Sequence, residues 1–155
     1  MSFQIHALPP EPFAKYFDYT SDELAARGAQ IHVVTEYPGT PCRVSLADAQ
    51  VGETVVLLNH EHLSKATPYR ASHAIFIRKD VTQAMLAVNA VPDVLSTRLL
   101  SIRGFDKTHN MRVADVVDGI KLGAALNDMF QSDTVAYIHI HNAKQGCFAA
   151  QATRV

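Results

Sequence analysis

The chain has 155 residues, 48% of them hydrophobic and 19% charged, and these proportions are typical of a folded globular protein. No stretch approaches the roughly 20 unbroken apolar residues of a membrane span, and the first ten residues lack the basic and apolar segments of a secretion signal. Only two cysteines are present, which excludes a disulfide framework or a multi-cysteine zinc module. We therefore expect a cytoplasmic protein without a membrane partner.

Charge is unevenly distributed, although the formal net charge is only -1. Residues 1–61 contain three Lys or Arg and eight Asp or Glu, whereas residues 62–155 contain eleven and seven. A positive C-terminal half could attract a phosphate or carboxylate ligand. The lack of Lys/Arg runs and a pI near 6.7 argue against nucleic acid as a partner.

The N-terminal region is expected to hold a loop followed by two short helices. Prolines at positions 9, 10 and 12 predict a loop, after which Phe13 and Phe17 have the spacing of one helical face. Thr20 and Glu23 form the pattern of a capping box. The helix that this box begins is predicted over residues 22–27.

Alternating or β-branched runs predict most of the remaining elements. The predicted strands cover residues 30–36, 53–62, 70–79, 99–105, 112–117, 134–142 and 147–153. The run over 53–62 is apolar on both alternating faces, so we expect both of its faces to be buried. The runs over 99–105 and 112–117 flank a polar turn and predict a hairpin.

The longest helix is predicted near residues 118–131, where Leu122, Leu126 and Met129 recur at helical spacing. Together these elements predict the α+β class, as a single domain over 1–155 built on a largely antiparallel sheet with a few short helices. A β-α-β crossover through the longest helix is the alternative arrangement of this region.

The chain contains three motifs, PGTPCRVSLADAQVGETVVLLNHEH (38–62), TPYRASHAIFIR (67–78) and YIHIHNAKQGCFAA (137–150). With these motifs it resembles a bacterial family catalogued only as a domain of unknown function, and the likeness covers nearly the whole chain. The resemblance implies a single-domain bacterial protein and brings no established activity. The residues in matching positions are Cys42, Arg43, His62, Tyr69, Arg70, His73, His139, His141, Asn142, Lys144 and Cys147. The family more often has Tyr at position 60, which argues against a functional role for His60.

Two His-x-His pairs, His60/His62 and His139/His141, lie in predicted strands, where a two-residue period projects both imidazoles from one face. Neutral imidazoles bind zinc and other transition metals, and His73 on a neighbouring strand could complete a three-histidine site with an open position. We name His62, His139 and His141 as candidate metal ligands. Alternatively, His139 and His141 belong to a polar, hydrogen-bonded sheet face.

Candidate catalytic residues are His73, His141 and Cys147. Imidazole titrates near neutrality, so His73 could act as a general acid or base oriented by a carboxylate such as Glu61. The alternative is a core histidine with both ring nitrogens hydrogen-bonded.

Cys147 could be a nucleophile with His141 as its base, if the hairpin places them opposite each other. A five-residue loop over 142–146 gives this register and keeps the larger Phe148 for the core face, so we favour it. A shift of one residue would pair His141 with Phe148 and turn Cys147 to the other face. Cys147 would then be a small buried hydrophobic residue.

Candidate substrate-binding groups border loops or strand ends, and they are Arg43, Tyr69, Arg70, Asn142 and Lys144. No glycine-rich phosphate loop or dinucleotide fingerprint occurs, so no nucleotide cofactor is expected. The resulting hypothesis is an enzyme that acts on a small polar or anionic metabolite through a His/Cys/Arg pocket. The alternatives are a non-catalytic metal-binding or small-ligand-binding domain and a structural domain. A homodimer is compatible with the sequence.

Overall fold

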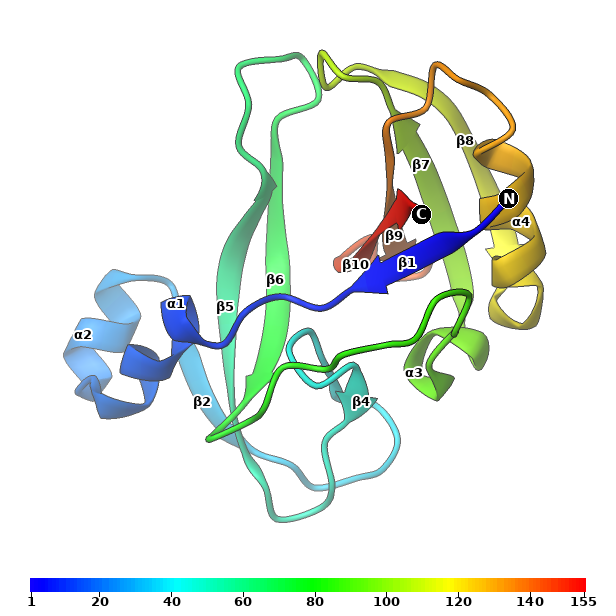
Figure 1. Ribbon diagram of the computed structural model, residues 1–155. Coiled ribbons are helices and arrows are strands. Elements are labelled where there is room, and N and C mark those ends of the chain that lie inside the picture. Colours follow the sequence, from blue (N-terminus) through cyan, green and yellow to red (C-terminus); the bar gives the residue numbers. More distant parts are fainter. The chain divides into compact units, whose positions relative to one another are not determined.

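The strands form two five-stranded sheets in the computed structural model, which describes residues 1–155 (Figure 1). The first sheet has the order β1-β10-β9-β7-β8, and all its neighbouring strands are antiparallel. Its strands are β1 (Phe3–His6), β7 (Leu99–Phe105), β8 (Met111–Asp118), β9 (Tyr137–Asn142) and β10 (Phe148–Arg154). Because β7 lies between β8 and β9, these two strands run in the same direction, and the chain crosses from one to the other through α4 (Leu122–Met129).

The second sheet has the order β2-β5-β6-β3-β4. Its strands are β2 (Gln30–Val33), β3 (Pro41–Cys42), β4 (Ala47–Asp48), β5 (Thr54–Leu63) and β6 (Ala71–Arg78). β2 pairs with β5 and β3 with β4 in antiparallel fashion, whereas β3 and β6 are parallel. The α+β class with mostly antiparallel pairing is confirmed, but the strands divide between two sheets where we expected one.

The helices are short: besides α4, they are α1 (Glu11–Ala14), α2 (Ser21–Ala26), α3 (Asp93–Ser96) and the 3-10 segments η1 (Lys15–Asp18) and η2 (Gly119–Lys121). The capping box at the start of α2 is confirmed. The Glu23 backbone N–H donates to Thr20 Oγ1 at 3.2 Å, and the Thr20 N–H donates to Glu23 Oε2 at 2.8 Å. None of the helices has the length and apolar character needed to cross a membrane.

The chain divides into two compact units, each assembled from separate segments. Unit 1 comprises residues 1–6, 61–73 and 85–155, and unit 2 comprises residues 7–60 and 74–84. β5 and β6 each begin in one unit and end in the other. The segments of the two units thus interleave along the sequence. The single domain that we expect from the sequence stays a prediction.

Unit 1 buries one face of its sheet beneath α4, which lies beside β8 in Figure 1. Leu122 and Leu126 are buried on α4, and Ile138 and Ile140 are buried on β9. Phe3 of β1 contacts this helix beside Gly123. The odd-numbered residues of β9 therefore lie on the opposite face of the sheet.

Unit 2 has apolar clusters on both faces of β5, as its sequence predicts. Val56 and Leu58 belong to a cluster that also contains Phe13 and Leu24. Val55 belongs to a second, smaller cluster with Val34 and Ala49. β5 is therefore a central strand covered on both sides.

Several elements escape the sequence patterns. Residues 3–6 form β1, whereas we expected a loop, because Phe3 and Ile5 pack into the core and pair with β10. A four-residue strand offers too little alternation beside three prolines to be recognised. β3 and β4 are two-residue strands, and β9 begins at Tyr137, later than the predicted 134.

Candidate metal centre

The alternation of β9 places Tyr137, His139 and His141 on the face of the first sheet that α4 does not cover. Partners in neighbouring strands share this face. Opposite His139 lie Arg103 on β7 and Gln151 on β10, and opposite His141 lie Ser101 on β7 and Phe148 on β10. The sheet thus brings polar, charged and aromatic side chains together within unit 1.

Three imidazoles converge on this face, those of His62, His139 and His141. One potential ligand atom from each lies within 4.8 Å of the others. The His62 ring centroid is 5.6 Å from that of His139 and 4.8 Å from that of His141. His139 and His141 are 2% and 1% exposed, so two of the three imidazoles are shielded from solvent.

The Phe148 ring stacks on the imidazole of His62. Its ring lies 5.4 Å from the His62 ring at an interplanar angle of 6°, and its edge contacts His139 and His141. His62 comes from the end of β5 that belongs to unit 1. The aromatic ring therefore forms an apolar wall common to all three histidines.

Hydrogen bonds orient two of the imidazoles. His141 Nδ1 donates to the Gly146 carbonyl at 2.9 Å, because a carbonyl oxygen can only accept. Its Nε2 must then carry a lone pair, and this atom is buried without a hydrogen-bond partner. His139 Nε2 pairs with Gln151 Oε1 at 3.3 Å, so Nδ1 is the nitrogen that a metal would take. Carbonyl and amide partners of this kind orient metal-binding histidines in proteins.

Burial lowers the pKa of His141 to about 3. The hydrogen bond to Gly146 favours the protonated form, but the positive charge of Arg103 and the neighbouring imidazoles add to the effect of burial. His141 is consequently neutral at physiological pH. The neutral imidazole is the form that coordinates a metal.

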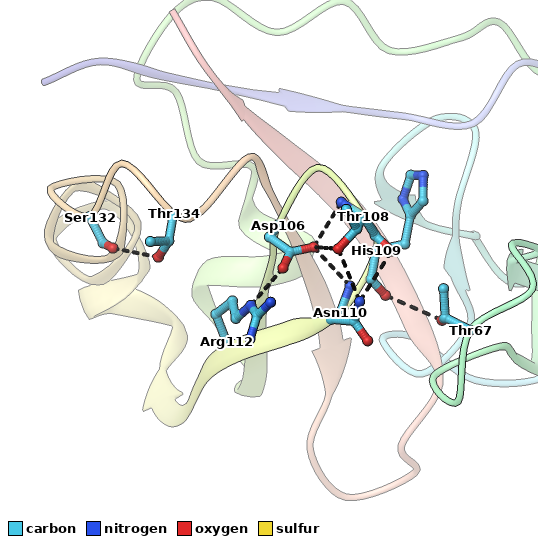
Figure 2. Close-up of polar contacts among 8 residues, drawn as sticks. All are labelled: Thr67, Asp106, Thr108, His109, Asn110, Arg112, Ser132 and Thr134. Atoms are coloured by element: carbon cyan, nitrogen blue, oxygen red, sulfur yellow. Dashed lines mark hydrogen bonds and ion pairs between the residues drawn. The ribbon is translucent and has the colours of Figure 1, made fainter.

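A polar turn joins β7 to β8 (Figure 2) and reaches Tyr137 on the same face through His109. Asp106 Oδ1 accepts hydrogen bonds from the backbone N–H groups of Thr108 and Asn110 at 2.8 and 3.1 Å, and Oδ2 pairs with Arg112 at 2.6 Å. The turn presents His109, whose Nδ1 is 2.9 Å from the Tyr137 hydroxyl. Burial raises the pKa of that hydroxyl, so Tyr137 remains protonated at neutral pH.

The favoured register of the last hairpin is wrong: His141 pairs with Phe148, not with Cys147. The loop is one residue shorter than we expected, because Gly146, at φ 78°, donates its N–H to Asn142 O and Cys147 lies beside Asn142. A β-bulge between Phe148 and Ala150 then reverses the alternation and turns Phe148 to the histidine face. Asn142 Nδ2 donates to Cys147 Sγ at 3.4 Å, on the face opposite His141.

The substrate-binding candidates of unit 1 do not gather at the histidines. Arg70 forms an exposed ion pair with Glu61 at 3.1 Å, so the Glu61 carboxylate that we expected to orient His73 pairs with Arg70. Tyr69 touches Phe105 edge to face, with ring centroids 6.1 Å apart. Lys144 is exposed in the hairpin loop, and Asn142 is buried on the other face of β9.

Two further candidates lie outside the cluster. His73, in unit 1, is half-buried and is not one of the three converging histidines. Arg43 lies in unit 2, where its guanidinium donates to the Pro41 carbonyl and its side chain is buried. His60, which the family resemblance argued against, contacts Phe13 in unit 2 with ring centroids 5.7 Å apart.

The sequence did not identify several residues around the histidines, namely Ser101, Arg103, Tyr137, Phe148 and Gln151. Arg103 carried one usable signal, because a charged residue in the middle of an otherwise apolar strand is unusual. The positions of Phe148 and Gln151 depend on the bulge in β10, which no residue pattern marks.

The cluster has the composition of a three-histidine metal site. Tetrahedral zinc with nitrogens at about 2.0–2.1 Å requires ligand atoms about 3.3 Å apart, so separations of up to 4.8 Å would have to contract by up to about 1.5 Å. Three protein ligands leave a coordination position for water or a substrate.

Comparison with the curated proteins gives no significant match, and neither does comparison with the solved structures. A family model described as "Protein of unknown function (DUF1203)" matches residues 39–154. These residues include both His-x-His pairs and every strand of the first sheet except β1. The match covers well over half of the chain, which therefore belongs to the DUF1203 family.

Proposed function

We propose that the protein binds one transition metal ion, with zinc the first to test, through His62, His139 and His141. The observation that carries this proposal is the convergence of one potential ligand atom from each imidazole within 4.8 Å. Imidazole nitrogens suit zinc, copper, nickel and iron, whereas calcium and magnesium prefer oxygen ligands. No cysteine or carboxylate belongs to the cluster.

His141 favours a metal site over an ordinary polar sheet face. A buried acceptor without a hydrogen bond costs about 1–3 kcal/mol, and the Nε2 lone pair of His141 is such an acceptor. Coordination to a cation would use that lone pair, while the Gly146 carbonyl fixes the tautomer that makes it available. A purely hydrogen-bonded sheet face would instead supply a donor to this atom.

The wider proposal is a metal-dependent enzyme of the cytoplasm that acts on a small anionic metabolite at this centre. A bound metal would supply a Lewis acid and lower the pKa of a coordinated water. The chain's own residues would hold the metal, keep solvent from one side with Phe148 and present polar groups from β7 and β10. The non-catalytic alternative is a domain that binds the metal without turnover.

The test is elemental analysis of the full chain, purified without chelators from cells grown in metal-supplemented medium. We expect about one equivalent of a transition metal per chain, lost in His139→Ala and His141→Ala and retained in His32→Ala, which removes an exposed histidine of unit 2. His62→Gln changes a half-buried ligand, so it tests loss of the metal even if substitution of the two buried histidines prevents folding. The proposal is wrong if the wild-type protein is purified without metal, does not bind added Zn²⁺ or Co²⁺ stoichiometrically and is not stabilised against heat by either ion.

A further inference from the structure

Arg103 lies beside the three histidines and has no assigned role. We infer that the metal centre takes an oxyanion, a carboxylate or phosphate group, held between the metal and the Arg103 guanidinium. This inference rests on the proposed metal site. It adds the chemical class of the ligand and names the residue that selects for it.

The strand register places Arg103 on the correct face. It is the direct cross-strand partner of His139, and directly opposed residues have Cβ atoms about 4.5–5.5 Å apart on the same side of a sheet. Ser101, two residues earlier on β7, is in the same way the partner of His141. Because both positions belong to β7, a central strand of the sheet, their placement is fixed by hydrogen bonds on both sides of that strand.

Arg103 has no carboxylate partner, unlike the arginines of β6 and β8. Its side-chain hydrogen bond runs from Nε to Ser101 Oγ at 3.3 Å, an interaction with a neutral group. In contrast, Arg78 pairs with Glu53 at 2.7 Å and Arg112 pairs with Asp106 at 2.6 Å. Arg103 is nonetheless half-buried, a setting in which a cation is normally matched by an anion.

Electrostatics explain why the missing anion would come from a ligand. A guanidinium and a metal dication on the same sheet face repel each other, and the repulsion grows where water is excluded. An oxyanion that coordinates the metal and accepts hydrogen bonds from the guanidinium would reduce this repulsion. The planar fork of arginine matches two oxygens of a carboxylate or phosphate.

The chemistry thus specifies a ligand with at least two oxygens and a negative charge. One oxygen would coordinate the metal at the position that three histidines leave open, and another would accept from Arg103. A neutral ligand could occupy the open position but would gain nothing from the guanidinium. The contribution of Arg103 is therefore expected to depend on the charge of the ligand.

The experiment uses the full chain loaded with Co²⁺, whose visible absorption reports changes in coordination. Inorganic phosphate, acetate and neutral imidazole are titrated separately into wild type, Arg103→Met, Arg103→Lys and the control Arg112→Met. We expect Arg103→Met to bind cobalt normally but to lose at least tenfold in affinity for phosphate and acetate, with imidazole binding unchanged. Arg103→Lys should retain part of the affinity, and Arg112→Met should behave as wild type.

The outcomes separate this inference from the proposal beneath it. If neither the wild type nor any variant binds cobalt, the proposed metal site is wrong and this inference is rejected with it. If cobalt binds but Arg103→Met and Arg103→Lys have wild-type affinity for both anions, the metal site stands and the role of Arg103 is rejected. An equal loss of affinity for imidazole would also reject it, because the effect would then not depend on the ligand's charge.

Discussion

At the scale of single residues, the role open to each histidine follows from the groups that its ring nitrogens contact. His6 and His32 are exposed and pair with the polar side chains of Thr153 and Gln30, which are ordinary surface contacts. His141 is buried, is oriented by a backbone carbonyl and has an Nε2 that no donor reaches. The same side chain therefore acts as a surface polar group in one place and as a potential ligand in the other.

Gln151 is predicted to tune the affinity of the proposed metal site. Its side-chain oxygen accepts from His139 Nε2, and groups that orient a liganding histidine typically contribute 10- to 100-fold to metal affinity. Gln151→Leu should therefore bind zinc about 10-fold or more weakly while keeping a stoichiometry of one. Competition with a chromophoric chelator measures the change. Gln145→Leu, at an exposed loop position, is the control, and equal affinities in both variants would show that Gln151 does not orient the ligand.

At the scale of elements, the β7–β8 turn is held by one carboxylate. Hydrogen bonds from the Asn110 backbone and the Thr108 hydroxyl, together with Arg112, lower the pKa of Asp106 well below its ordinary value, although burial opposes the shift. The Asp106 side chain thereby binds three residues, Thr108 and Asn110 in the turn and Arg112 in β8 (Figure 2). This turn also sets the position of His109, which has a backbone φ of 63° and whose Nδ1 contacts the Tyr137 hydroxyl.

The turn should make stability depend on pH. A carboxyl group whose pKa is lower in the folded state stabilises the protein fully above its unfolded pKa of about 4, and this contribution is lost as pH falls toward the folded pKa. Asp106→Asn should therefore lower the denaturation midpoint at pH 7, and the difference from wild type should shrink below pH 4. Urea unfolding at pH 7 and pH 3 measures both. Asp133→Asn, at an exposed site, is the control, and a difference independent of pH would contradict the argument.

Two glycines at the start of the α4 region make a matched pair. A Cβ on Gly119 would lie 2.0 Å from the Leu95 carbonyl oxygen, whereas a Cβ on Gly123 would meet Phe3 no closer than 3.7 Å. Gly119→Ala should destabilise the protein by about 1–3 kcal/mol or more, because backbone must move apart. Gly123→Ala should stabilise it by up to about 1 kcal/mol, since alanine favours a helix. Urea unfolding compares the two variants, and similar free energies of unfolding would show that η2 and α3 can separate without cost.

The sequence predicts elements well where a long periodic pattern exists. The run over 99–105 matches β7 residue for residue, and the alternation after 134 correctly separates Ile138 and Ile140 from the two histidines of β9. The pattern fails where one residue decides the outcome. The bulge in β10 and the left-handed Gly146 shift the hairpin register by one, and that single step exchanges Cys147 for Phe148 beside His141.

At the scale of the whole molecule, prediction from the sequence fails for a different reason. Local spacing finds the pair His139/His141, but the choice between His62 and His73 as the third member depends on how distant segments fold together. Arg103 was missed for the same reason, since its importance comes from its cross-strand partner and not from its neighbours in sequence. Contacts across 36 or more residues are set by tertiary packing, which periodicity does not encode.

The interleaving of the two units has a consequence for how the protein is made. His62 leaves the ribosome long before His139, and the segment that carries it lies between two pieces of unit 2. The three imidazoles can come together only after β9 has been synthesised. During translation the growing chain therefore carries isolated histidines and no complete chelating set. If the three histidines bind a metal ion as proposed, the complete site can capture it only after β9 has been made, which protects the nascent chain from earlier loading.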